Sequence, residues 1–206
     1  MKNITKLLSL LIIICILTAV LWGCGDDSLT NEEISKILGS DALPITYALP
    51  QYAINMADLR QVVGDADYVF VCKVSSYNTT EYLSNLNNFP LTLYNIEIIE
   101  NIKGELKQSE QIVLKKAGGI SQDHKSFWIY QDDSLLKVNS YYIISVYTQP
   151  DGGILTGGIN SHLTIENPED YVAEANYIAI LDAYQNEIVI DRGRYECKYD
   201  VSYDEN

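Results

Sequence analysis

The sequence predicts a mainly β domain with one clear helix near its C-terminal end and short helices near its N-terminal end. One segment, which begins at Asn167, follows the helical period. The chain of 206 residues is long enough for one core domain with short extensions. Apolar β patterning separated by turn residues recurs in five segments, namely 68–74, 91–102, 111–115, 141–147 and 154–159.

Two short helices are expected before the first strand. Thr30 opens a capping pattern that predicts a helix ending at Gly39. Asp58 predicts the N-cap of a second helix, which would end at Gly64. Between them, residues 40–56 contain two prolines and predict an irregular or extended linker.

The first two strands are expected to be separated by a long loop. Residues 68–74 are nearly all apolar or aromatic, as in a strand that is covered on both faces. Residues 77–90 are polar and rich in Asn, which predicts a loop between strands. In the second strand, the doublet Ile98-Ile99 interrupts the alternation of apolar side chains and predicts a β-bulge.

The later strands follow from turn signals. A turn at 103–105 precedes the third strand, and a loop is expected from Gly118 to Asp133. The fourth strand, at 141–147, leads through the tight turn 150–153 into the fifth strand.

One helix and an acidic tail are expected to complete the chain. Asn167 is a favourable N-cap, and an acidic first turn follows it. Residues 188–190 could add a short strand, and the segment beyond Arg194 is expected to be loosely ordered at its end.

The N-terminal 24 residues carry the clearest functional signal. Two lysines precede an apolar run of the length of a signal-peptide core, which ends in Leu21-Trp22-Gly23-Cys24. This ending resembles the lipobox of bacterial lipoproteins. The resemblance implies that residues 1–23 are a signal peptide and that Cys24 becomes the lipidated first residue of a protein on the outer face of the bacterial cell membrane. The alternative is an uncleaved N-terminal anchor helix. We therefore divide the chain into the signal peptide 1–23, a tether with a short helix at 24–56, and a β domain with helix and tail at 57–206.

The charge of the chain restricts its partners. Removing residues 1–23 removes two lysines and no acid, which leaves 12 basic and 28 acidic side chains. Nucleic acid is excluded as a partner, because its binding depends on neutralising phosphates with Lys and Arg. Attachment to anionic lipid by charge is disfavoured for the same reason, whereas attraction to a cation or a basic partner stays open. The charge could equally serve only to keep the protein soluble.

Two cysteines are left once Cys15, inside the apolar run, and Cys24 are assigned. Export would permit a disulfide between Cys72 and Cys197, which closes a long loop. Alternatively, Cys72 is a small buried residue of its apolar strand. The sequence leaves both readings open.

The order of strands and turns resembles a known barrel. The run from Gly64 to Val74, the long strand ending in Ile102-Lys103-Gly104-Glu105, and the segment 137–144 are similar to small secreted or lipid-anchored bacterial domains. The same scheme, over residues 62–160, is similar to the N-terminal domain of tissue inhibitors of metalloproteinases. That resemblance implies an OB-like closed barrel of five to six strands. Those inhibitors chelate zinc through a free N-terminal cysteine, which Cys24 does not supply, so only the fold is carried over. In these similar domains a turn glycine precedes the strand that corresponds to 141–147, and this chain has Asn139 at that position. Asn is the residue that best replaces glycine at a positive φ, so we expect a positive φ at Asn139.

Residues with catalytic chemistry are sparse. The two histidines, His124 and His162, have no second ligand at metal-binding spacing. Ser121 lacks the Gly-x-Ser-x-Gly elbow of hydrolases. The run Asp132-Asp133-Ser134 has calcium-type oxygens without the spacing of a calcium loop. We therefore expect neither an enzyme, nor a cofactor, nor a metal site.

Aromatic residues are the best candidates for a binding surface. Phe127, Trp128 and Tyr130 alternate with other residues in the expected 118–133 loop. OB-like barrels bind through strand faces and connecting loops, and exposed aromatic side chains often anchor contacts with a protein or a sugar. These residues could instead cover one end of the barrel as core. The sequence favours a non-catalytic binding or scaffold lipoprotein that contacts an envelope protein or cell-wall glycan. The alternatives are an inhibitor of an envelope protease, by analogy of fold, and an enzyme of unrecognised type.

Overall fold

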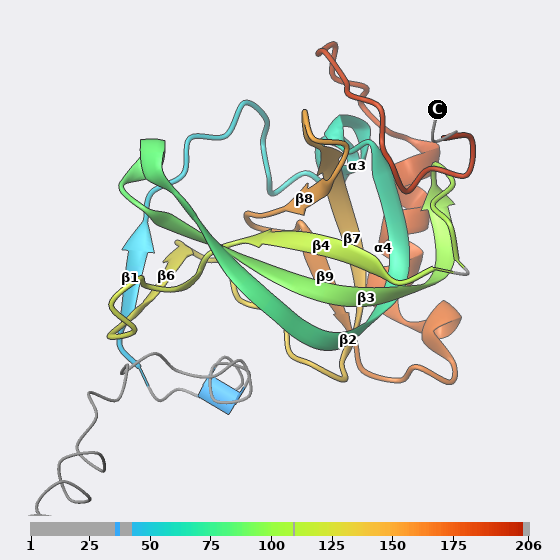
Figure 1. The fold of residues 1–206 in the computed structure, drawn as a ribbon. Helices are drawn as coiled ribbons and strands as arrows, with labels where there is room; N and C mark the ends of the chain where they lie inside the picture. The colour runs from blue at the N-terminus through green and yellow to red at the C-terminus, as the bar shows by residue number, and fades with distance from the viewer. Residues whose placement is uncertain (1–35, 38–42, 109, 204–206) are drawn as a thin grey trace, which may run out of the picture. The chain divides into compact units, whose positions relative to one another are not determined.

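The computed structural model describes residues 36–37, 43–108 and 110–203, and these form a mainly β structure built on a closed barrel (Figure 1). Hydrogen-bonded neighbours follow the order β2-β3-β4-β8-β7, and β7 pairs again with β2, which closes the barrel. The pairs are antiparallel except for β4 and β8, which are parallel. This confirms the predicted OB-like barrel. Its strands are β2 (Tyr68–Leu83), β3 (Phe89–Lys103), β4 (Ile112–Ala117), β7 (Tyr141–Thr148) and β8 (Ile154–Thr156), and β9 (His162–Ile165) is added beside β7.

A second, smaller sheet replaces most of the loop that the sequence predicts at 118–133. It consists of β1 (Ile45–Ala48), β6 (Phe127–Tyr130) and β5 (Gly119–Ile120), in the order β1-β6-β5. β1, within the predicted linker, runs parallel to β6. The loop prediction was wrong here because the strands are short and the pairing between β1 and β6 joins segments about 80 residues apart, which local patterning cannot reveal.

The expected loop at 77–90 is in fact a continuation of β2 and β3. The two strands pair as far as Leu83 and Phe89, and the 3-10 turn η1 (Ser84–Leu86) joins them. One of the polar residues that suggested a loop, Asn78, donates across the hairpin to the Asn95 side chain at 3.0 Å, and Asn95 in turn donates to Ser76 Oγ at 2.9 Å. Side-chain bonding between polar partners therefore sustains strands that lack apolar alternation.

Two local predictions are confirmed. Val71 pairs with Glu100 and Cys72 with Ile98, so the extra residue Ile99 forms the predicted bulge. Asn139 adopts a φ of +64° in the turn before β7.

The core lies inside the barrel and between the barrel and two helices. Phe70, Cys72 and Val74 of β2 point into the barrel interior, whereas the alternate residues Val69 and Val71 face the helices. The helices are α3 (Leu59–Asp65) and α4 (Ala175–Gln185), and Figure 1 shows α4 beside the barrel strands. Asp58 caps α3 as predicted, since its side chain accepts from the Arg60 amide. The burial of β2 on both faces explains its continuous apolar run.

The C-terminal part differs from prediction in two ways. Asn167 does not cap a helix, because its carbonyl accepts from the Asp170 amide in a turn and the 3-10 turn η2 (Tyr171–Ala173) intervenes before α4. Residues 188–190 form no strand. The acidic tail is described as far as residue 203, where Cys197 is buried and a β-bridge joins Leu106 and Asp200, and its last three residues lie outside the described part.

The predicted signal peptide 1–23, Trp22 and Cys24 lie outside the described residues. Of the first predicted helix, only Lys36 and Ile37 are described, and both are helical. Within the described part of the chain, no helix has the length and apolar character needed to span a membrane.

Candidate functional site

The three aromatic residues singled out from the sequence have different surroundings. Phe127 is buried, with 5% of its surface exposed. Tyr130 is half-buried and stacks on Phe89, with ring centroids 5.1 Å apart. Trp128 is half-buried and lines a hollow of about 450 Å³. Trp128 is therefore the member of the predicted set that can meet a ligand, and the other two support the sheet. The hollow is lined by Thr46, Asn87, Asn88, Ser121, Gln122, Asp123, Ser126 and Trp128.

The small sheet fixes Trp128 in place. Its neighbours across the strands are Thr46 on β1 and Gly119 on β5. A side chain at Gly119 would clash, because a Cβ atom there would lie 2.3 Å from Thr92 Oγ1. The indole Nε1–H donates to Ser126 Oγ at 3.2 Å, and the ring packs against an apolar cluster that includes Phe89. The ring is thus held by packing on one side while it lines the hollow.

The loop between β5 and β6 forms one wall of the hollow and is organised around Ser121. The Ser121 hydroxyl donates to Asp123 Oδ1 at 2.7 Å and accepts from the amides of Lys125 and Ser126. The hydrogen bond from Ser121 and that from the Lys125 amide hold the pKa of Asp123 below its ordinary value. His124 lies within this turn with a φ of +57°. Ser121 therefore orders the loop, and Asp123 supplies a carboxylate to the hollow.

The tip of the β2–β3 hairpin forms the opposite wall. Asn87 and Asn88 both have a positive φ, of 54° and 56°, which Asn tolerates better than most residues. Their side-chain amides and that of Gln122 make no hydrogen bond to any other described residue. Three amide groups are thus free to bind a ligand.

The chemistry of the hollow fits a ligand rich in hydroxyl and amide groups. An indole ring offers a flat apolar surface, and the amides, hydroxyls and carboxylate around it offer both donors and acceptors. Its volume lies in the range of small-molecule pockets. In OB folds, the loop between the first two barrel strands is one of those that bind oligosaccharides, and here that loop carries Asn87 and Asn88.

A second polar cluster lies deeper and was missed by sequence analysis. Lys116 and Asp133 form an ion pair of 2.5 Å between Nζ and Oδ2, and their side chains are 0% and 1% exposed. His162 lies beside them, with Nδ1 at 3.7 Å from Asp133 Oδ1 and Nε2 at 3.1 Å from Ser134 Oγ. The sequence signal that could have revealed this cluster is Lys116, which stands on the apolar face of β4. A buried ammonium requires an acidic partner, so the pattern indicates that a carboxylate lies nearby.

This cluster superficially resembles a Ser-His-Asp triad but differs from one in its electrostatics. In a triad the carboxylate supports a protonated imidazole, whereas here Lys116 already neutralises Asp133. Burial and the charge of Lys116 lower the pKa of His162 to about 4, so the ring is a weak base at neutral pH. The Nδ1 to Oδ1 distance also exceeds that of a hydrogen bond. The arrangement serves to anchor the segment after β6 to β4.

The remaining sequence candidates are resolved by their surroundings. Asp133, considered as a calcium ligand, is committed to Lys116 and to the Gly158 amide at 2.8 Å. In residues 36–37, 43–108 and 110–203, no three side chains of the metal-binding types come together. Of the two alternatives that the sequence left open for Cys72 and Cys197, the structure has the unbridged one, with two free thiols. Both are buried within the barrel core, and burial raises the pKa of each thiol.

A comparison of the chain with protein-family models finds no match, and a search of curated proteins finds no similar protein.

Proposed function

We propose that this protein is a non-catalytic binding lipoprotein, held on the outer face of a bacterial cell membrane by lipid on Cys24, which contacts a cell-wall glycan through the hollow around Trp128. The observation that carries the proposal is the composition of this hollow: one fixed indole, three free amides, several hydroxyls and one carboxylate. Sugars combine apolar C–H faces with many hydroxyl groups, so they need both an aromatic surface and hydrogen-bonding partners.

In this proposal the lipid anchor alone holds the protein at the membrane, and no basic surface is needed to bind anionic lipid. Each buried CH₂ of an acyl chain contributes about 0.8 kcal/mol, so two or three chains hold a protein durably at a membrane. An acidic domain on such an anchor needs no membrane-binding face of its own. Metabolic labelling with palmitate tests this part: the wild-type chain should carry the label, and Cys24→Ala should lose it.

Intrinsic fluorescence tests the glycan site directly. The chain has two tryptophans, and Trp22 lies in the proposed signal peptide, so the mature protein carries Trp128 as its single tryptophan reporter. We expect a soluble chain of four β-1,4-linked N-acetylglucosamine units to shift or quench this fluorescence saturably. Asn88→Gly should weaken binding without unfolding the protein, because the Asn88 side chain is exposed, has no partner among the described residues, and glycine adopts its φ of +56° freely.

A matched control comes from an aromatic side chain away from the hollow. Tyr184→Phe alters an exposed residue of α4 and should leave the titration unchanged. No fluorescence change up to millimolar sugar, or equal binding by Asn88→Gly, would reject the glycan assignment and favour a protein partner.

A further inference from the structure

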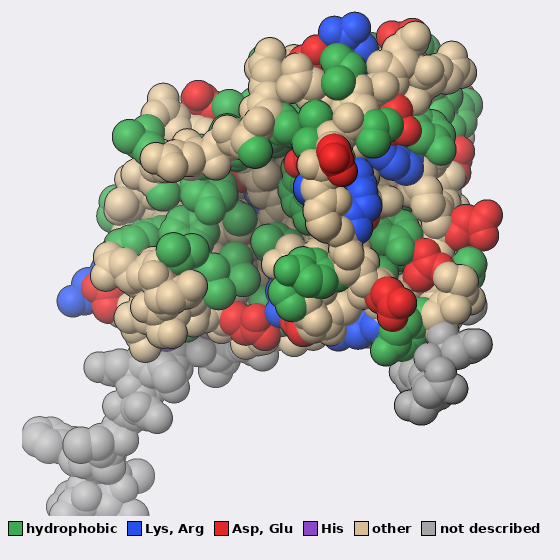
Figure 2. All heavy atoms as spheres, turned by 90° about the horizontal axis from the view of Figure 1, so that it is seen from above, with side chains coloured by type: hydrophobic (Ala, Val, Ile, Leu, Met, Phe, Trp, Pro, Cys, Tyr) green, Lys and Arg blue, Asp and Glu red, His purple; other side chains and the backbone are tan. Residues whose placement is uncertain are grey.

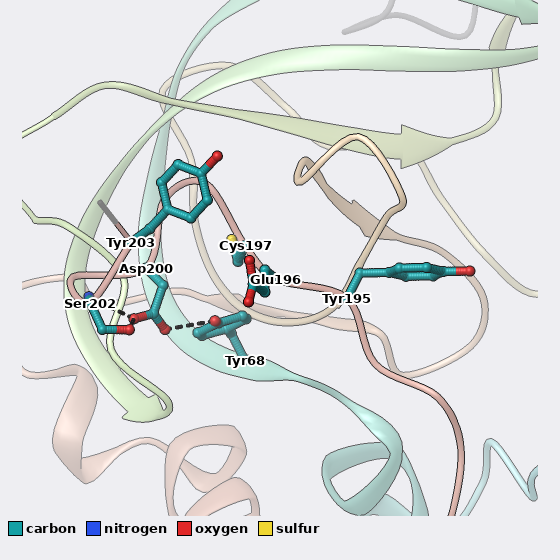
Figure 3. A pocket seen from close by; sticks show the side chains of 7 residues that line it. All are labelled: Tyr68, Tyr195, Glu196, Cys197, Asp200, Ser202 and Tyr203. Carbon is teal, nitrogen blue, oxygen red and sulfur yellow. Dashed lines mark hydrogen bonds between the residues drawn. The ribbon is translucent and has the colours of Figure 1, made fainter. Parts of the chain in front are cut away.

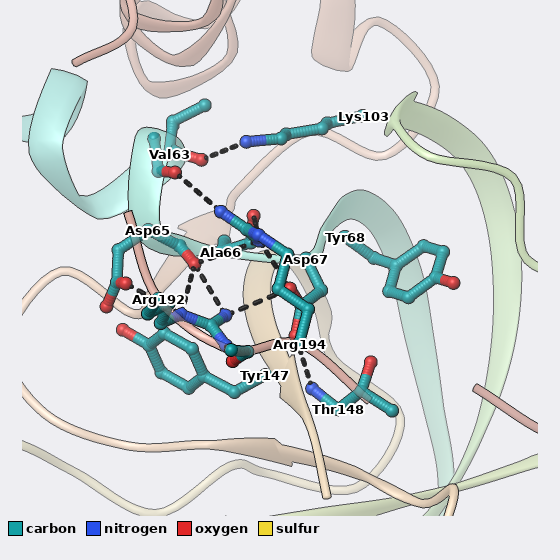
Figure 4. Close-up of polar contacts among 12 residues, drawn as sticks. Val63, Asp65, Ala66, Asp67, Tyr68, Lys103, Tyr147, Thr148, Arg192 and Arg194 are labelled. Carbon is teal, nitrogen blue, oxygen red and sulfur yellow. Dashed lines mark hydrogen bonds and ion pairs between the residues drawn. The ribbon is translucent and has the colours of Figure 1, made fainter. Parts of the chain in front are cut away.

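The C-terminal segment 187–203, named here the C-terminal strap, is bound tightly to the start of β2 (Figure 4). Arg192 donates to Asp65 Oδ1 and Asp67 Oδ1, both at 2.9 Å, and to the Asp65 carbonyl at 2.7 Å. Arg194 also contacts Asp67 and donates to the carbonyls of Ala66 and Gly64. Both guanidinium groups of the strap are therefore committed to the barrel.

A pocket of about 400 Å³ opens between the strap and β2 (Figure 3). In the close-up, the Tyr68 ring lies below the Glu196 carboxylate, Asp200 lies beside the ring, and Tyr195 points away from the others. The pocket is lined by Tyr68, Tyr195, Glu196, Cys197, Asp200, Ser202 and Tyr203.

Hydrogen bonds fix the inner wall of this pocket. The Tyr68 hydroxyl donates to Asp200 Oδ2 at 2.6 Å, and the amide and hydroxyl of Ser202 donate to Asp200 Oδ1 at 2.8 Å and 2.6 Å. Although burial opposes ionisation, the bonds from Ser202 and Tyr68 hold the pKa of Asp200 below its ordinary value. The carboxylate is therefore charged and its position is set.

The pocket carries negative charge that no side chain of the described part neutralises. Neither Glu196 nor Asp200 has a Lys, Arg or His nitrogen within 4.0 Å among these residues, and Glu196 makes no side-chain hydrogen bond to them. Lys198, the nearest lysine in the strap, lies over the Tyr199 ring instead, 5.1 Å from its centroid. On the face seen in Figure 2, some acidic side chains lie beside Lys or Arg side chains and others stand apart from them.

We propose that this pocket binds a protonated amine, with Glu196 and Asp200 as its counter-charges and the rings of Tyr68 and Tyr203 as its aromatic walls. Ammonium groups are attracted both to carboxylates and to the faces of aromatic rings. A metal ion fits less well, because the pocket offers two carboxylates rather than a full set of oxygen ligands and its volume exceeds that of an ion. None of these residues lines the hollow around Trp128, so this site is independent of the glycan proposal.

The amine could belong to a small free molecule or to a lysine side chain of a partner protein. Two probes distinguish these sources: n-butylamine, and lysine blocked at its α-amino and carboxyl groups. The full-length protein in detergent micelles is titrated at pH 7, and the amide signals of Glu196, Cys197 and Ser202 are followed by NMR. If only butylamine binds, the natural ligand is a small free amine. If blocked lysine binds as well, the pocket also admits a lysine side chain of a partner protein.

Glu196→Gln is the decisive variant, because Glu196 is exposed and its replacement disturbs no described contact. We expect it to weaken binding about fivefold, because one of the two counter-charges is lost and the exposed position of Glu196 lets solvent screen part of the attraction. Glu169→Gln removes the same charge from another exposed position and should leave binding within about twofold of the wild type. The uncharged analogue n-butanol should not shift these signals. Equal shifts with n-butanol, equal affinity in Glu196→Gln, or no binding of either amine would overturn the proposal.

Discussion

Replacing Asp133 by Asn should destabilise the protein strongly, because it leaves a buried ammonium without its counter-charge. Lys116 is 0% exposed, and Asp133 is its one ion-pair partner in the described part of the chain. Removing one member of a buried pair costs about 3–5 kcal/mol. Burial lowers the pKa of Lys116 despite the opposing charge of Asp133, so the lysine can escape part of the cost by losing its proton. We therefore expect a loss of about 3 kcal/mol in the free energy of unfolding.

Two companion variants, Lys116→Met and the double variant Lys116→Met/Asp133→Asn, test whether the loss of stability comes from an unpaired buried charge. In Lys116→Met the carboxylate keeps two backbone donors, the amides of Ser134 and Gly158, each at 2.8 Å. In the double variant Lys116→Met/Asp133→Asn neither charge is left buried. The double variant should consequently be more stable than the sum of the two single losses predicts, by about 1–3 kcal/mol.

Urea unfolding followed by circular dichroism measures these losses, provided that the slope of the transition is unchanged. The neighbouring lysine supplies a matched control: Lys115 pairs with Asp151, whose side chain is 53% exposed. Asp151→Asn should cost no more than about 1 kcal/mol. A loss below about 1 kcal/mol for Asp133→Asn, or strictly additive single losses, would refute a charged and buried pair.

Two further predictions concern the histidine of this cluster and the strap. Because the folded-state pKa of His162 is about 4 and the ordinary value is 6.5, the unfolded chain takes up the proton first as the pH falls. Stability should therefore decline between about pH 6.5 and pH 4, by up to about 3 kcal/mol, and His162→Gln should flatten this part of the profile; an unchanged profile would contradict the assignment. Asp67 holds both strap arginines and accepts from the Thr148 amide at 2.7 Å, so Asp67→Ala should speed hydrogen exchange of amides 194–203 more than that of α4. Equal protection in wild type and variant would show that the strap is held by other contacts.

The apolar strands and turns were predictable because their signals are local. The continuous run at β2, the Ile98-Ile99 bulge, the Asp58 cap and the positive φ at Asn139 each depend on a few adjacent residues. Trp128 was also recognisable from the sequence as a candidate binding residue, because it is an aromatic residue in a largely polar segment. The lipobox-like ending at Cys24 is a sequence pattern as well, and its consequence awaits the labelling experiment.

The sequence by itself thus determined a mainly β domain, its principal strand segments and three aromatic candidates for binding, of which the structure leaves Trp128 at a hollow. Tertiary structure decided what depends on partners distant in the chain. The polar β2–β3 hairpin, the pairing of β1 with β6 and the ion pair of Lys116 with Asp133 join residues whose local patterns do not indicate each other. Both pockets arise in the same way, since Asn87 meets Ser121 and Tyr68 meets Asp200 only after the barrel closes. Side-chain periodicity records which face of a segment is buried, but not which segment covers it.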